Sequence, residues 1–311
     1  MTTAPARVDI REVGPRDGLQ LAPPLAFDAK ERLIRALAAS GLTRIEATAF
    51  VSPRAVPSMA DAERVAELVA QLPGITWSAL VASANGAQRA LASRMTQLEY
   101  VVSASDGHSV ANMRRTTSEA TAAIGDIVRI AHDAGASIEV IIATAWDCPF
   151  DGPTPAARTV EVARQAAAAG ADALCLGDTV GTTVPGRVVR LVDQVREVAP
   201  QLPLGAHFHN TRGAGIACAW AAVTAGVTQL DASIAGFGGC PFAPGASGNI
   251  ATEELVYLLN GSGVDTGVDL DLLLSAARLA DSVVGQDARS QLLRAGGPLR
   301  PLDAPKAAAA G

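Results

Sequence analysis

Two histidines separated by a single residue, His207 and His209, are the pair whose type and spacing point most directly to chemistry. They end the apolar run 204–209, and residues two apart in a β-strand point to the same side. Two imidazoles that converge in this way can bind a metal ion; the alternative is a pair of hydrogen-bonded core histidines. Because the whole chain holds only four histidines, we favour a metal site.

Asp17 and Asn249 could complete such a site with a carboxylate and an amide oxygen. Mixed nitrogen and oxygen ligands suit Mg²⁺, Mn²⁺ or Co²⁺ better than a closed thiolate zinc site, and they leave positions for water or substrate. The alternative for Asp17 is a turn residue before Gly18. We expect a divalent cation, Mg²⁺ or Mn²⁺.

Charged residues near these ligands suggest further roles. Arg16 could stabilise an enolate, or it could be a surface arginine that pairs with Asp17. Glu12 and Glu46 lie within expected strands, where a buried carboxylate needs a partner, so they could orient Arg16 or form structural ion pairs with it. Asp178 ends an apolar strand and could accept a proton or position a metal-bound water; a helix N-cap is the alternative.

The segment 236–249, GFGGCPFAPGASGN, combines glycines that permit unusual backbone angles with prolines that stiffen the chain. It lies between an expected strand and an expected helix at 251–260. We predict that this loop moves one side chain, Cys240, in and out of a site.

Short β-rich runs alternate with longer helical runs, and these elements must position the candidate residues. The expected strands are 8–13, 44–50, 76–81, 97–103, 137–144, 173–178, 204–209 and 229–235. Eight such units predict an α/β fold, a single (β/α)8 TIM barrel of about 250 residues, with a doubly wound open sheet as the alternative. In a barrel, the candidate residues all fall at the C-terminal ends of the strands, where TIM-barrel active sites lie.

The helical runs between these strands often end at glycine, a common helix terminator. Examples of the expected helices are 28–39, 59–71, 118–134, 154–169, 185–198 and 215–225. We predict one domain, residues 1–293, made of the barrel and appended C-terminal helices from about residue 261. Residues 294–311, rich in alanine, glycine and proline, are expected to form a disordered tail.

Composition limits the partners and the compartment. The 311 residues are 49% hydrophobic and carry a net charge of −6 without a basic run, so no nucleic-acid partner is expected. The four cysteines form no Cys-x-x-Cys pair, and no apolar run is long enough to span a membrane. We expect a soluble, reduced, cytoplasmic protein in which Cys175 and Cys218 are small core residues.

Taken together, these segments resemble the 3-hydroxy-3-methylglutaryl-CoA lyase family, within the pyruvate-carboxyltransferase-like (DRE-TIM) metallolyase barrels. The resemblance covers about residues 8–271. The motifs that show the resemblance are VGPRDGLQ at 13–20, IEATAFVSPR at 45–54, LGDTVG at 176–181, and the loop from 236 through NIATEELVY at 249–257.

The resemblance implies a lyase that cleaves the C2–C3 bond of a branched 3-hydroxyacyl-CoA to acetyl-CoA and a keto acid. It implies a homodimer and an acyl-CoA thioester substrate. The implied metal ligands are Asp17, His207, His209 and Asn249; the implied catalytic residues are Arg16, Cys240, Asp178, Glu46 and His207. Asp178 and His207 both remain candidates for the base, and the expected substrate contacts are Arg16, Gln20, Asn112 and Arg212.

Several positions depart from the family pattern. The sequence HFHNTRG at 207–213 has Asn210 and Arg212 where an aspartate and a tyrosine are usual. Ala49 replaces a hydroxyl-bearing residue, and 141–149 lacks a usual cysteine. We therefore expect a relative of 3-hydroxy-3-methylglutaryl-CoA as substrate, with Arg212 holding an additional carboxylate.

Three alternatives remain open at this point. One is an acetyl-CoA-dependent synthase of the same superfamily, although such enzymes usually add a long C-terminal regulatory portion. Another is a related lyase with a different branched substrate. The third is a non-enzymatic protein that binds metal or CoA, against which the cysteine loop argues.

Overall fold

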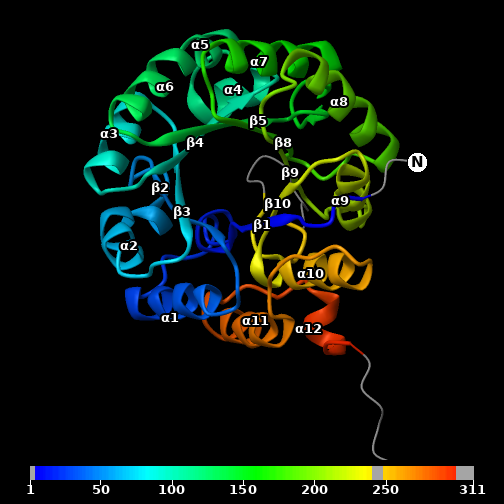
Figure 1. Cartoon of the computed structure of the whole chain (residues 1–311). Coiled ribbons are helices and arrows are strands. Elements are labelled where there is room, and N and C mark those ends of the chain that lie inside the picture. Colours follow the sequence, from blue (N-terminus) through cyan, green and yellow to red (C-terminus); the bar gives the residue numbers. More distant parts are fainter. Residues whose placement is uncertain (1–3, 240–247, 299–311) are drawn as a thin grey trace, which may run out of the picture.

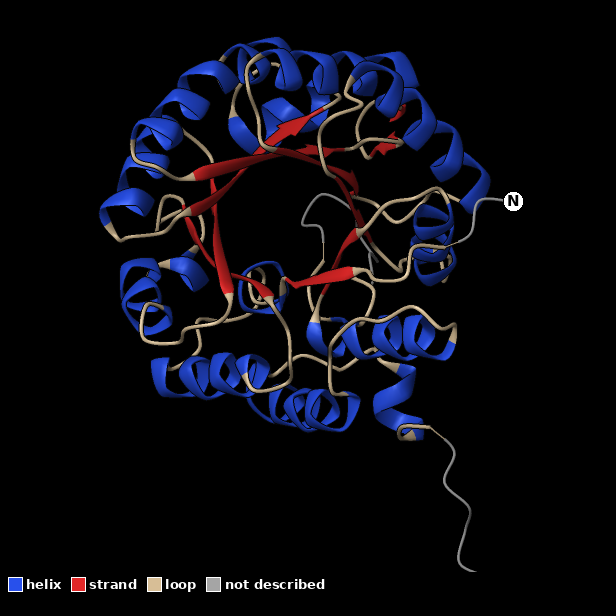
Figure 2. Ribbon diagram, viewed as in Figure 1, coloured by secondary structure: helices blue, strands red, loops and turns tan. Residues whose placement is uncertain are grey.

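The computed structural model of the chain describes residues 4–239 and 248–298. Within these ranges eight parallel strands close into a barrel in the order β1-β10-β9-β8-β5-β4-β3-β2, with the helices around them (Figures 1 and 2). Strand β1 pairs with both β2 and β10, which excludes the open-sheet alternative. The barrel strands are β1 (Asp9–Glu12), β2 (Arg44–Phe50), β3 (Thr76–Val81), β4 (Gln97–Ser103), β5 (Ser137–Ala143), β8 (Ala173–Asp178), β9 (Leu204–Phe208) and β10 (Gln229–Ala232). The predicted TIM barrel is confirmed.

Most of the helices follow the expected pattern. They are α1 (Phe27–Ala38), α2 (Ala62–Val69), α3 (Ala84–Ala92), α4 (Asp106–Met113), α5 (Thr117–Ala122), α6 (Ile124–Asp133), α7 (Ala156–Ala168), α8 (Pro185–Val198), α9 (Gly215–Thr224), α10 (Thr252–Gly261), α11 (Leu270–Val284) and α12 (Gln291–Ala295). The ranges named from the sequence do not include α3, α4 or the short hairpin of β6 (Asp147–Cys148) and β7 (Gly152–Pro153), and the single range 118–134 covers both α5 and α6. Helices α3 and α4 are short, which weakens their periodic signal.

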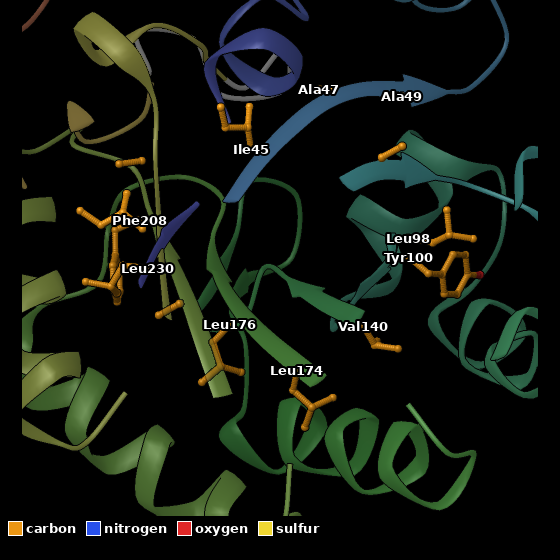
Figure 3. Close-up of a cluster of buried hydrophobic side chains, with 14 of the residues drawn as sticks. Ile45, Ala47, Ala49, Leu98, Tyr100, Val140, Leu174, Leu176, Phe208 and Leu230 are labelled. Atoms are coloured by element: carbon orange, nitrogen blue, oxygen red, sulfur yellow. The ribbon is translucent and has the colours of Figure 1, made fainter. Parts of the chain in front are cut away.

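The barrel wall separates an apolar outer face from a polar interior. Alternate side chains along each strand point to opposite faces. The outward set packs against the helices (Figure 3), and includes Ile45, Leu98, Tyr100, Leu174 and Leu176. Residues between them, such as Glu99 and Cys175, point inward and are fully buried. The barrel therefore encloses charged groups where branched apolar residues are usual.

The C-terminal helices lie beside α1: α11 packs against both α1 and α10. Helix α12 ends at Ala295, so the described structure extends past the predicted start of the tail at residue 294. The remainder of that predicted tail, residues 299–311, lies outside the described residues. In the described ranges no helix is long and apolar enough to cross a membrane. Cys175 and Cys218 are buried, as expected of core residues.

A buried carboxyl at the start of α10 makes stability depend on pH. Glu253 accepts a hydrogen bond of 3.2 Å from the backbone nitrogen of Ala235, whose φ is +57°. Burial raises the pKa of Glu253 from 4.5 to about 7. The folded state then holds a proton that the unfolded state releases between about pH 4.5 and 7, so this group lowers the free energy of unfolding as pH rises through that window.

We expect Glu253→Gln to flatten this decline, because the amide cannot lose a proton. The measurement is the urea-derived free energy of unfolding between pH 4.5 and 7.5. Glu67→Gln, at an exposed position, is the control. An identical pH slope in wild type and Glu253→Gln would contradict the assignment.

Candidate metal centre and pocket

A single turn of π-helix after β1, η1 (Gly14–Gly18), carries Arg16 and Asp17. Its hydrogen bonds span five residues: the nitrogen of Gly18 lies 3.2 Å from the oxygen of Val13, and that of Leu19 lies 3.0 Å from the oxygen of Gly14. A Cβ at Gly18 would lie 2.6 Å from Ser233 Oγ, so a larger residue here would require that hydroxyl to move from its place beside η1. Such turns occur often at functional sites.

The predicted metal ligands come together at the mouth of the barrel. Ligand atoms of Asp17, His207 and His209 all lie within 4.8 Å of one another. An isolated β-bridge pairs His209 with Asn249. Asn249 Nδ2 in turn donates hydrogen bonds to Asp17 Oδ2 at 2.7 Å and to the oxygen of Phe237 at 3.0 Å. Four residues spread over more than 230 positions of sequence therefore share one site.

The protonation states at this site suit a cation. Burial lowers the pKa of His209 to about 4, so its ring is neutral at neutral pH. Burial alone would raise the pKa of Asp17, but the charge of Arg16 and the hydrogen bond from Asn249 Nδ2 act against it, and this pKa lies below its usual value. A neutral imidazole and an ionised carboxylate are the forms that bind metals.

Two buried polar atoms at the site have no hydrogen-bond partner among the described residues, as expected if a metal ion binds there. These atoms are His209 Nδ1 and Asn249 Oδ1. Buried polar atoms in proteins rarely remain unpaired without a functional reason. Together with Asp17 and His207, the residues His209 and Asn249 provide a mixed nitrogen and oxygen set, which fits a divalent cation.

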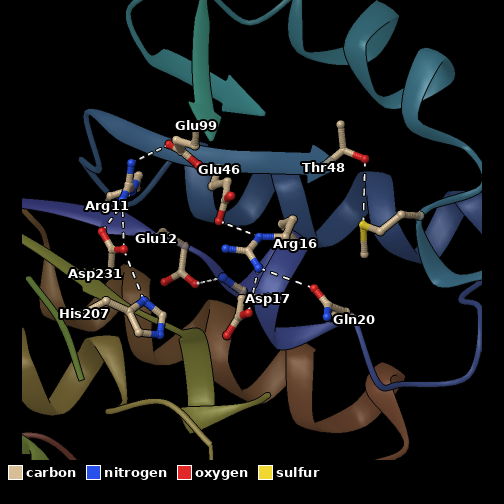
Figure 4. A network of polar contacts seen from close by, with 12 residues as sticks. Arg11, Glu12, Arg16, Asp17, Gln20, Glu46, Thr48, Glu99, His207 and Asp231 are labelled. Atoms are coloured by element: carbon tan, nitrogen blue, oxygen red, sulfur yellow. Dashed lines mark hydrogen bonds and ion pairs between the residues drawn. The ribbon is translucent and has the colours of Figure 1, made fainter. Parts of the chain in front are cut away.

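Arg16 lies beside the metal ligands between two carboxylates (Figure 4). Its Nη1 is 2.7 Å from Asp17 Oδ1, and its Nε is 2.7 Å from Glu46 Oε2 on β2. Arg16 is only 7% exposed, and Glu46 is fully buried. Burial raises the pKa of Glu46, while the charge of Arg16 acts against that rise. Glu46 thus holds the guanidinium of Arg16 in place. This agrees with the interpretation of the sequence in which Glu46 orients Arg16.

Glu12 does not orient Arg16, and that interpretation of the sequence is wrong. Its Oε1 accepts hydrogen bonds from the backbone nitrogens of Gly14 at 2.7 Å and Ile234 at 2.8 Å. Its Oε2 accepts one from Thr252 Oγ1 at 2.5 Å. Glu12 therefore fastens η1 to the end of β10 and to α10, because these loop and helix-end donors need an acceptor.

Asp178 lies at the end of β8 with its carboxylate turned toward the following loop. Its two oxygens accept hydrogen bonds of 3.2 Å from the nitrogens of Thr182 and Thr183. It is not the N-cap of α8, which begins at Pro185 after Val184. Burial raises the pKa of Asp178 to about 6, which is suitable for a proton acceptor near neutral pH.

A pocket of about 680 Å³ opens above the metal ligands. Arg16, Gln20 and Asn112 line it, as do Arg54, Arg114 and Arg115. Ala49 also lines it, past a register shift in β2 between Glu46 and Thr48.

Arg212 and Asn210, by contrast, face other partners. Arg212 is exposed, is not among the residues that line this pocket, and donates to the backbone oxygens of Val180 at 3.3 Å and Gly181 at 3.4 Å. Asn210 Oδ1 accepts a hydrogen bond of 3.1 Å from the nitrogen of Gly215 at the start of α9. The geometry therefore gives no support to Arg212 as a substrate contact.

Cys240 lies outside the described residues, so its predicted position and mobility stay predictions. Both flanks of its segment are described, and they meet at the metal site. A Cβ at Gly238, whose φ is +115°, would lie 2.5 Å from Asn249 Nδ2. Gly239 lines the pocket. Residue 239 thus brings the chain to the pocket immediately before Cys240.

A buried ionic cluster beneath the metal ligands was missed by sequence analysis (Figure 4). Its members are Arg11, Glu99, Glu139 and Asp231, all at most 5% exposed, and Figure 4 labels all of them except Glu139. Arg11 contacts each of the three carboxylates. Although burial alone would raise it, Arg11 and His207 hold the pKa of Asp231 below its usual range. A usable sequence signal existed for the three carboxylates, because Glu99, Glu139 and Asp231 are each the only charged residue in their strands.

Comparisons with known proteins agree with this arrangement. The HMGL-like family model matches residues 7–280. The mitochondrial hydroxymethylglutaryl-CoA lyase of Macaca fascicularis is 36% identical over 296 residues, 95% of this chain and 91% of that protein. The Bacillus subtilis lyase is 35% identical over 291 residues, 93% of this chain and 97% of that protein.

A solved structure is similar over the same length. It is an HMG-CoA lyase from Acinetobacter baumannii in complex with coenzyme A and 3-methylmalate, which is 37% identical to this chain. It superposes with a TM-score of 0.90 and covers 97% of this chain and 100% of its own. The family match and these relatives extend over the barrel and its candidate metal-ligand residues, and the chain therefore belongs to the HMGL-like family of carbon–carbon lyases.

Proposed function

We propose that this enzyme is a divalent-metal-dependent lyase that cleaves the C2–C3 bond of a 3-hydroxy-3-methylglutaryl-CoA-like thioester. The products would be acetyl-CoA and acetoacetate or its analogue. The observation that carries the proposal is the convergence of Asp17, His207 and His209 beside Arg16 at the base of one pocket. The family membership supports the same reaction type.

Asp17, His207, His209 and Asn249 would hold Mg²⁺ or Mn²⁺, whose Lewis acidity would make the substrate's C3 hydroxyl more acidic. The unpaired Asn249 Oδ1 and His209 Nδ1 support this ligand set. A base would take the hydroxyl proton, the C2–C3 electrons would pass to the thioester, and the C3 carbon would become the ketone of the leaving acid.

Arg16 would stabilise the thioester enolate left after cleavage. Glu46 and Asp17 pair with two of its nitrogens, Nε and Nη1. A fixed donor aimed at developing charge costs little reorganisation during the reaction. Protonation of C2 would then complete acetyl-CoA. The family resemblance is the basis for assigning Cys240 a part in this proton transfer.

Two groups could accept the hydroxyl proton. Asp178 has a pKa raised to about 6 by burial, but its oxygens face the loop amides. His207 lines the pocket, but its Nδ1 faces Asp231 at 3.1 Å. A fall in kcat/KM below about pH 6 that disappears in Asp178→Asn would assign the base to Asp178.

The charge of the pocket supports an anionic substrate such as an acyl-CoA. The protein carries a net charge of −6, yet four arginines and one carboxylate line the pocket: Arg16, Arg54, Arg114, Arg115 and Asp17. Such a local field attracts anions despite the overall charge. The Acinetobacter baumannii relative was solved with coenzyme A bound.

We expect Arg114→Gln and Arg115→Gln each to raise the KM for an acyl-CoA about 3- to 10-fold with little change in kcat, because a charge far from the reacting carbons contributes uniform binding. The matching pantetheine thioester, which lacks the nucleotide phosphates, should be affected much less. Steady-state kinetics with both thioesters measures this, with Arg129→Gln on the exposed face of α6 as control. Equal KM increases for the two thioesters would count against a phosphate contact.

The substrate is best identified by mass spectrometry of products from a panel of branched 3-hydroxyacyl-CoA thioesters with Mg²⁺ or Mn²⁺. The panel should include the reverse assay, acetyl-CoA with several 2-keto acids. Cleavage faster than condensation is expected. Consumption of acetyl-CoA at a higher rate would favour the synthase alternative, and turnover of neither kind would favour a binding protein.

A further inference from the structure

We propose that Asp231 is a positioning residue for the metal centre, and that Arg11 holds Asp231 in place. Asp231 would fix the orientation and tautomer of His207, so the buried ionic cluster would set the affinity for the metal. This inference rests on the proposed metal site, which it extends from the ligands to the barrel interior.

Strand register places the three residues side by side. Arg11 on β1 pairs with Asp231 on β10, and Asp231 pairs with His207 on β9. Register partners in a sheet direct their side chains to the same face. The face here is the barrel interior, where Figure 4 shows the three side chains in contact.

The contacts form a continuous chain to the metal ligand. Arg11 Nε and Nη2 donate to Asp231 Oδ1 and Oδ2, both at 2.8 Å, in a two-pronged arrangement. Asp231 Oδ2 also lies 3.1 Å from His207 Nδ1. The Asp231 side chain is 6% exposed, so these contacts exclude water almost completely.

This geometry selects one nitrogen of His207 for the metal. An ionised Asp231 can only accept, so Nδ1 of His207 must carry the hydrogen, and Nε2 keeps the lone pair. Partners of this kind typically change metal affinity about 10- to 100-fold when removed.

The cluster is not explained by stability alone. Arg11 also contacts Glu139 Oε1 at 2.8 Å and pairs with Glu99. Buried ion pairs contribute little net stability compared with apolar residues of similar volume. A guanidinium surrounded by three carboxylates can, however, hold Asp231 in one orientation. Asp231 can then hold the ring of His207, the proposed metal ligand, in one orientation as well.

The experiment measures Mn²⁺ binding to the purified full chain by calorimetry, without any substrate. Asp231→Asn is expected to raise the Mn²⁺ Kd about 10- to 100-fold, because its amide can donate to Nδ1 and favour the wrong tautomer. Asp172→Asn makes the same chemical change beside another histidine, because Asp172 Oδ2 lies 3.0 Å from His132 Nε2 on the surface, and it should leave the Kd within about 3-fold. The metal-free melting temperature reports any general loss of structure.

A double-mutant cycle separates positioning from general damage. In a His207→Gln background, Asp231→Asn should change the Kd less than about 2-fold, since no ring remains to orient. An unchanged Kd for Asp231→Asn, or an equal change in both backgrounds, would overturn the inference. If Asp231→Asn does not fold, Arg11→Lys applies the same test, and an unchanged Kd there would also overturn it.

The outcome distinguishes this inference from the proposed function. A wild-type protein that binds Mn²⁺ but cleaves no thioester would refute the proposed reaction and leave the positioning role supported. A wild-type protein that binds neither Mn²⁺ nor Mg²⁺ would overturn both.

Discussion

Replacing Arg16 with lysine is expected to lower kcat about 100- to 1,000-fold, the effect of losing a preorganised donor to a developing oxyanion. Lysine keeps the positive charge between Glu46 and Asp17, so the fold should tolerate it. It cannot hold both carboxylates and still offer a third nitrogen to the enolate. Because the enolate forms only along the reaction, KM should change less than about 3-fold.

Steady-state kinetics with the preferred thioester measures the effect of Arg16→Lys. Arg89→Lys is the matched control, because Arg89 pairs with Glu63 at 2.6 Å on the outside of the barrel. It should leave kcat within about 2-fold. A similar kcat in Arg16→Lys and wild type would remove Arg16 from the chemistry, and a rise in KM alone would reduce its role to substrate binding.

Replacing His209 with phenylalanine is expected to raise the Mn²⁺ Kd at least about 100-fold, more than the loss of a partner outside the ligand set. Phenylalanine fills the buried space of the ring but offers no lone pair. Cleavage should fall to background at metal concentrations that saturate the wild type. Removal of metal from the wild type with a chelator should have the same effect, and added Mn²⁺ should reverse it.

His132→Phe is the control for this substitution, since His132 is exposed and pairs with Asp172 at 3.0 Å on the surface. It should leave both the Kd and the rate unchanged. Full metal affinity in His209→Phe would show that the ligand set is wrong.

The barrel could be predicted from the sequence because its signals are local. Apolar runs, helical periodicity and terminal glycines such as Gly41 and Gly226, both with positive φ, mark each unit. The convergence of Asp17, His207, His209 and Asn249 then followed, because parallel strands bring their C-terminal ends to one face.

The remaining features depend on contacts between distant segments. The π-helical turn η1 is anchored by Glu12, which joins the backbone of Gly14 to that of Ile234, more than 200 residues away. The cluster around Arg11 becomes visible only when the strand register pairs Arg11 with Asp231. The direction of Arg212 is set by the carbonyls of Val180 and Gly181, which its sequence position does not reveal.

The central claim is that this pocket uses a divalent metal to break one carbon–carbon bond. The most direct measurement incubates chelated wild-type protein, with and without Mn²⁺, with the thioester that the panel identifies, and counts both products by mass spectrometry. Acetyl-CoA and the keto acid are expected in equal amounts, and only when metal is present. Equal rates without metal, or free CoA in place of acetyl-CoA, would contradict the claim.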